Sequence, residues 1–238
     1  QYIYLVKPTN VIYIAFDGVA PVAKLEQQRN RRHKSSFEES IMQSYGKPPK
    51  MDTTQITPGT EFMKNLSNKI ISYFQDASMF GVKELIISTS NENGEGEHKL
   101  YKHIRDNPHT YKDFYTVIYG LDADLIMLTI NHLRYSKDMY LFRETPEFIK
   151  SINSDLDPNQ LYILNINELK YNIAVDMNNG INDITYDEMD ILINDYVFIC
   201  FILGNDFIPH SPCINIRTNG IDILLNIYNK NYIISNIY

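Results

Sequence analysis

Short apolar runs recur along the chain and have the length and composition of β-strands. Four of them are residues 11–16, 84–89, 115–119 and 139–143. The first run is continuously apolar and ends at Asp17-Gly18, which is typical of a parallel strand buried on both faces. A fifth segment, residues 161–166, fits either a strand or an extended loop.

Helix-start signals occupy the segments between these runs. Pro21 predicts the start of a helix that continues from Val22 to Ser44. Thr57 as N-cap and Pro58 in the first turn predict another helix, which ends near Gln75. Further helices are predicted over residues 97–105, 189–203 and 219–229.

The remaining segments are expected to connect these elements. Residues 46–50, 91–96, 107–113 and 131–138 have the composition of loops or short connections. Residues 144–188 are rich in Asn and Asp and are expected to form an irregular lobe or insertion. Strands that alternate with helices predict an α/β fold with a mostly parallel sheet flanked by helices, here as one domain over residues 1–238.

Composition limits the class of protein. A chain of 238 residues with 44% hydrophobic content can bury a sizeable core. Its two cysteines, in no metal-binding spacing, favour a reducing compartment and argue against structural zinc. With no signal peptide and no apolar run long enough for a membrane, an intracellular protein is expected. The chain begins with Gln1 and enters a strand almost at once, so we expect a piece of a longer protein.

Carboxylates are the first candidate chemistry. Six of them lie at predicted strand ends, helix ends or turns: Asp17, Glu95, Glu97, Asp122, Asp124 and Asp206. The carboxyl ends of parallel strands are where such sheets bind ligands, and six acids gathered there would repel one another. Mg²⁺ or Mn²⁺ would remove that repulsion, and two such ions roughly 3.5–4 Å apart can hydrolyse a phosphodiester. Each acid alone also fits a capping or solvated turn residue. A cation-filled site also reconciles the net charge of −7 with binding to a nucleic acid.

A basic stripe is the second candidate. Lys24, Gln28, Arg31 and Arg32 follow i, i+4, i+7, i+8 spacing and share one face of the helix directly after Asp17. Lysine offers a point charge and arginine a bidentate fork, so the stripe is suited to a phosphate group. A solvated basic surface is the alternative. His98 is a candidate for holding a carboxylate ligand, or a structural histidine.

Five sequence blocks together resemble the Xrn 5′→3′ exoribonucleases. They are residues 15–32, 56–63, 94–99, 119–128 and 204–210. The resemblance implies a PIN-like or flap-nuclease-like catalytic core that hydrolyses single-stranded RNA from a 5′-monophosphate end. It implies that the six acids bind two Mg²⁺ or Mn²⁺ ions and that Lys24, Gln28, Arg31 and Arg32 bind the terminal phosphate. Residues 134–188 match no block of the family.

The resemblance also implies partners and a setting. Decapping or RNA-processing factors are possible partners, no membrane is involved, and the cytoplasm is expected ahead of the nucleus. The family carries a further acidic ligand before Asp17, whereas none of the sixteen residues before Asp17 is acidic. Two alternatives stay open: a flap-type nuclease acting on branched DNA, and an inactive RNA-binding fragment.

Overall fold

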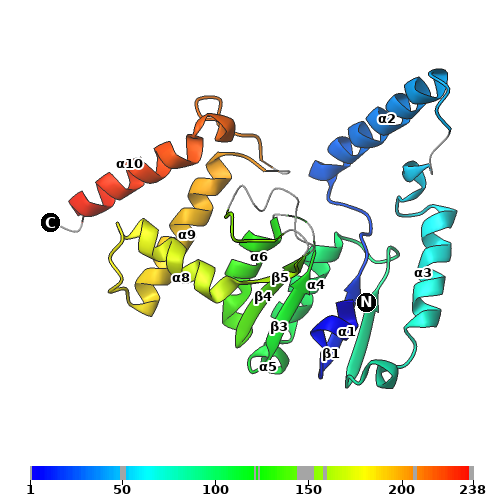
Figure 1. The fold of residues 1–238 in the computed structure, drawn as a ribbon, viewed down its shortest axis with the longest axis horizontal. Helices are drawn as coiled ribbons and strands as arrows, with labels where there is room; N and C mark the ends of the chain where they lie inside the picture. Colours follow the sequence, from blue (N-terminus) through cyan, green and yellow to red (C-terminus); the bar gives the residue numbers. More distant parts are fainter. Residues whose placement is uncertain are drawn as a thin grey trace. The chain divides into compact units, whose positions relative to one another are not determined.

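The computed structural model describes residues 2–48, 52–120, 122, 124–143, 153–157, 160–205 and 208–235. Contacts between residues divide the chain into two compact units, Gln1–Asp106 and Asn107–Tyr238, which are described separately below. Each unit contains both helices and strands (Figure 1), which confirms the expected α/β class.

The first unit contains two parallel strands, β1 (Val11–Ala15) and β2 (Glu84–Ser88). Ala15 pairs with Ser88, so the two strands end side by side and the loops that follow them meet. The helices of the unit are α1 (Tyr2–Val6), α2 (Val22–Ser44), α3 (Glu61–Tyr73) and α4 (Gly96–Asp106), with 3-10 turns η1 (Thr53–Gln55) and η2 (Ala77–Phe80). Helix α4 packs against β1 and buries Tyr101 and Ile104.

The second unit contains a three-stranded sheet in the order β3-β4-β5, with β3 parallel to β4 and β5 antiparallel to it. The strands are β3 (Tyr115–Tyr119), β4 (Asp138–Arg143) and β5 (Tyr162–Asn165). The helices are α5 (Pro108–Tyr111), α6 (Asp124–His132), α8 (Ile166–Met177), α9 (Tyr186–Ile202) and α10 (Gly220–Ser235), with turns η3 (Leu133–Tyr135) and η4 (Ile216–Thr218). Met139 and Phe142 of β4, Ile166 of α8 and Leu192 of α9 are almost fully buried and form much of its core.

The strand predictions agree with the structure, and β3 and α2 have the predicted bounds. The prediction for the start of α3 is wrong. The side chain of Thr60, not that of Thr57, caps this helix by accepting from the Met63 N–H at 3.3 Å. Gly59 has a φ of +89°, in the left-handed region, so the Pro58-Gly59 turn delays the helix.

The prediction of an irregular segment at residues 144–188 is wrong for its second half. Helix α8 fills residues 166–177, and Asn165 caps it by accepting from the Asn167 and Glu168 N–H groups. Its buried positions, 166, 170, 174 and 177, follow helical spacing. One of them is Lys170, which interrupts the apolar pattern and conceals it in the sequence. Helix α6 directly after β3 was likewise not predicted.

Candidate metal and phosphate site

The loops after β1 and β2 are joined to each other by their backbones. The Gly18 N–H donates to the Gly94 carbonyl at 2.8 Å, and the Gly94 N–H donates to the Val19 carbonyl at 3.0 Å. These reciprocal bonds hold the segment that follows Asp17 against the segment that precedes Glu95. The predicted acids of the two loops are therefore brought together within the first unit.

Asp17 also contacts the start of helix α4. Its Oδ1 accepts a hydrogen bond from the Gly96 N–H at 2.6 Å, so a carboxylate from one loop caps a helix that begins after the other. A Cβ on Gly96 would lie 3.1 Å from the Ala15 carbonyl oxygen, closer than nearly all such contacts. Glycine at this position lets the first turn of α4 approach the end of β1. Asp17 remains exposed to solvent while it makes this bond.

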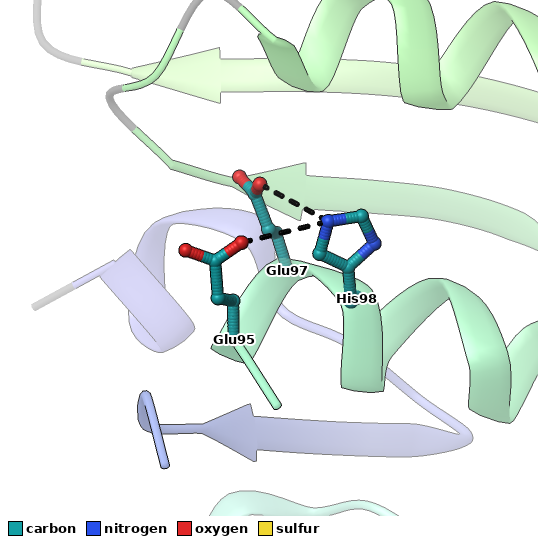
Figure 2. Close-up of side chains that lie close together, drawn as sticks. All are labelled: Glu95, Glu97 and His98. Carbon is teal, nitrogen blue, oxygen red and sulfur yellow. Dashed lines mark ion pairs between the residues drawn. The ribbon is translucent and has the colours of Figure 1, made fainter. Parts of the chain in front are cut away.

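Glu95, Glu97 and His98 form a cluster at the first turn of α4 (Figure 2). His98 Nε2 lies 3.6 Å from Glu95 Oε2 and 3.9 Å from Glu97 Oε1. One ligand atom of each residue lies within 4.8 Å of the others, which is close enough for a shared cation. Glu95 is buried, and its Oε2 has no hydrogen-bond partner among the described residues. A buried carboxylate oxygen that accepts no hydrogen bond and lies beside a second carboxylate fits a hard divalent cation.

The other oxygen of Glu95 is held by the basic stripe. Lys24 Nζ lies 2.7 Å from Glu95 Oε1, and the two side chains are only 9% and 6% exposed. Lys24 stands at the start of α2, two turns before the exposed Arg31. Arg32 is half-buried and places Nη1 3.5 Å from Thr57 Oγ1, while Gln28 is half-buried. The stripe therefore begins inside the acidic cluster and continues outward along α2.

Lys99 also belongs to this site, although no role was predicted for it from the sequence. Its ammonium is buried and donates to the carbonyl oxygens of Phe16 and Thr89, both at 2.9 Å. These carbonyls lie just beyond the ends of β1 and β2, so one side chain from α4 ties both strand ends to the helix. Burial lowers the pKa of Lys99, an effect opposed by the nearby carboxylates of Glu92 and Asp17. A charged residue on the otherwise apolar face of α4 was the signal in the sequence.

The second unit presents its acids at the corresponding position, after the end of β3. Asp122 is exposed, and Asp124 begins α6 and is also exposed. A Cβ on Gly120 would lie 2.2 Å from Leu125 Cδ1, so the Leu125 side chain lies directly against Gly120. Asp206, the remaining predicted ligand, lies outside the described residues.

A search of the helices in the described ranges finds none that is long and apolar enough to cross a membrane.

Comparison with known protein families gives two matches along the chain. The profile of the XRN 5′-3′ exonuclease N-terminus matches residues 1–145, and the profile of the Xrn1 helical domain matches residues 186–238. These matches cover the blocks on which the resemblance to Xrn proteins was based, and they confirm it.

Individual relatives agree. The chain is 32% identical over 285 residues to 5′-3′ exoribonuclease 2 of Arabidopsis thaliana, covering 96% of this chain and 28% of the relative. It is 34% identical over 277 residues to 5′-3′ exoribonuclease 2 of Saccharomyces cerevisiae, covering 94% of this chain and 26% of the relative. With 5′-3′ exoribonuclease 1 of the same yeast, identity is 30% over 244 residues, 94% of this chain and 16% of the relative. The chain thus spans little more than a quarter, or less, of the length of these relatives.

Proposed function

Because this chain belongs to the XRN family of 5′-3′ exonucleases, we propose that it hydrolyses single-stranded RNA from a 5′-monophosphate end. The observation that carries the proposal is the direct contact between the basic stripe and the acidic cluster, through Lys24 and Glu95. A phosphate held by the stripe would lie next to carboxylates suited to a catalytic cation. The proposed catalytic domain comprises both units, with a mostly parallel sheet of the PIN-like and flap-nuclease type.

Recognition of the RNA end is assigned to helix α2. Lys24, Gln28, Arg31 and Arg32 would bind the terminal phosphate, with the arginine forks matching its oxygens. A binding site that accommodates a single phosphate would disfavour capped and triphosphorylated ends. The proposed substrates are therefore RNAs already converted to a 5′-monophosphate, and decapping or RNA-processing factors are the proposed source. The proposed setting is RNA decay or processing inside the cell, in the cytoplasm ahead of the nucleus.

The proposed metal ligands are the acids of both units. Mg²⁺ or Mn²⁺, as two ions, would be held by Asp17, Glu95, Glu97, Asp122, Asp124 and Asp206. When bound, these ions would activate water and neutralise charge that develops on the phosphodiester. The buried Oε2 of Glu95, which accepts no hydrogen bond from the described residues, and the proximity of Glu97 support this assignment in the first unit.

The side chains of the site would act by positioning the RNA and the metal ligands. Gripping the terminal phosphate fixes the register of the strand, so that the first internal phosphodiester lies at the acids and one nucleotide is released per cut. His98 contacts both Glu95 and Glu97 and would hold their orientation. Lys99 would keep the two strand ends and α4 together. Since water is the nucleophile in this scheme, no covalent intermediate is expected.

The test is a comparison of RNA ends and one substitution. The purified protein with Mg²⁺ should degrade 5′-monophosphate RNA and leave the same RNA with a 5′-triphosphate nearly intact. Equal rates on the two ends would remove the phosphate assignment. Asp122→Ala should abolish cleavage while single-strand binding persists, and full activity in that variant would remove the metal role of Asp122. Cleavage of a circular substrate would favour a flap-type endonuclease instead.

A further inference from the structure

Lys24 has two anionic partners available to it. In the structure its ammonium pairs with Glu95 Oε1 at 2.7 Å, with both side chains more than nine-tenths buried. In the proposed function, the same ammonium binds the terminal phosphate of RNA, and the same carboxylate binds a cation. The three N–H groups of one lysine can contact both anions, but its single positive charge cannot fully neutralise both at once.

Burial makes the exchange of partners depend on the cation. A buried carboxylate without a countercharge is strongly disfavoured, so Lys24 cannot leave Glu95 unless another positive charge replaces it. A divalent cation at Glu95 supplies that charge and also repels the adjacent ammonium. The released ammonium then needs an anion of its own, and a 5′-phosphate carries the opposite charge.

We propose that Lys24 is an exchangeable counter-ion, which neutralises Glu95 until a divalent cation binds and then turns to the 5′-phosphate. This inference rests on the proposed function and adds a regulatory link within the same site. Cation binding and phosphate recognition become positively coupled, and by thermodynamic linkage each ligand tightens the other by the same factor. The enzyme would thus select a 5′-monophosphate end only when it is loaded with metal.

The first experiment measures equilibrium binding without cleavage. Short RNAs with a 5′-monophosphate or a 5′-hydroxyl are titrated by fluorescence anisotropy, in EDTA and in Ca²⁺. The phosphate should improve affinity by about tenfold or more in Ca²⁺ and by less than about twofold in EDTA. A preference of equal size in both conditions would overturn the coupling and leave the proposed function standing. No preference in either condition would instead overturn the proposed phosphate site itself.

Two variants, Lys24→Met and Glu95→Gln, test the exchange directly. Lys34→Met is the matched control for Lys24→Met, because Lys34 is exposed on the same helix and pairs with Glu38. Lys24→Met removes the competitor for Glu95, so Mn²⁺ measured by electron paramagnetic resonance should bind about tenfold more tightly. Unchanged or weaker Mn²⁺ binding in a folded Lys24→Met protein would contradict the proposal. Lys34→Met should leave Mn²⁺ affinity unchanged.

Glu95→Gln provides the second, independent reading. It removes the charge that holds Lys24, so a clear preference for a 5′-phosphate should appear in EDTA, where the unaltered protein should show less than about a twofold preference. A Glu95→Gln protein that still lacks the preference in EDTA would show that Glu95 does not restrain Lys24. Glu95→Gln keeps the ammonium of Lys24 and Lys24→Met keeps the carboxylate of Glu95, so the two variants break the buried pair from opposite sides.

Discussion

Gly18→Ala is the substitution whose effect the structure defines most sharply. A Cβ at this position would lie 1.7 Å from the carbonyl oxygen of Glu92 and 2.8 Å from its carbon. Real Cβ atoms essentially never approach closer than 3.0 Å, and the obstacle is backbone rather than a flexible side chain. The loops after β1 and β2 must therefore separate to admit the methyl group.

The expected cost follows from the contacts that separation breaks. The Gly18 N–H bond to Gly94 and the Gly94 N–H bond to Val19 would be lost, each contributing about 0.5–1.5 kcal/mol. Strain from overpacking adds about 1–3 kcal/mol, so the free energy of unfolding should fall by about 2–6 kcal/mol. The same movement pulls Asp17 away from the Gly96 N–H, so Mn²⁺ affinity should also fall.

Urea denaturation and Mn²⁺ titration measure the two effects. Gly81→Ala is the control in the same unit, since nothing lies within 4 Å of its added Cβ and only its φ of +69° opposes the change. That left-handed conformation costs about 1–2 kcal/mol and should leave Mn²⁺ affinity unaltered. If Gly18→Ala is no more destabilising than Gly81→Ala and binds Mn²⁺ normally, the described joining of the two loops is refuted.

Three further predictions concern other contacts. Lys99→Met should weaken Mn²⁺ binding and lower the free energy of unfolding by about 2–4 kcal/mol, because two carbonyls lose a charged donor. Lys102 is exposed on the same helix, so Lys102→Met should change neither quantity. Equal effects of the two substitutions would contradict the role of Lys99. Glu188 has a lowered pKa because it accepts from the hydroxyl and N–H of Thr185. The stabilising contribution of Glu188 should be complete above its ordinary pKa of 4.5 and vanish as pH falls through the lowered pKa. The difference in unfolding free energy between the unaltered protein and Glu188→Gln should therefore shrink on acidification. A difference that grows would contradict this prediction. Phe142→Ala, at a side chain 1% exposed, should cost about 3–5 kcal/mol in thermal or urea denaturation, and a loss under 1 kcal/mol would contradict its place in the core.

The sequence predicted the strands well because each is a short apolar run between turn signals. The run at residues 115–119 became β3 without a shift, and Val22–Ser44 became α2. Helix α8 escaped prediction because its buried face includes Lys170, whose ammonium pairs with Asp190 on α9. A charge satisfied by a tertiary contact looks, in sequence alone, like a break in an apolar face.

Part of the candidate site could likewise be predicted from the sequence, and part could not. Residue type and position at strand ends indicated Asp17, Glu95 and Glu97, and the structure brings these three to the joined loops of the first unit. The pairing of Lys24 with Glu95 could not be predicted from the sequence, because the two residues belong to segments that meet only when β1 and β2 pair. The predicted sharing of cations between the acids of both units stays a prediction.

The direction and product of cleavage would show whether the protein removes nucleotides one at a time from the 5′ end of RNA. A single-stranded RNA carrying radioactive phosphate at its 5′ end is incubated with the protein and Mg²⁺, and the products are resolved over time. The label should appear from the first time points as a mononucleotide, while the same RNA labelled at its 3′ end should shorten progressively. Release of the 5′ label in longer fragments, or cleavage of circular RNA at a similar rate, would contradict it.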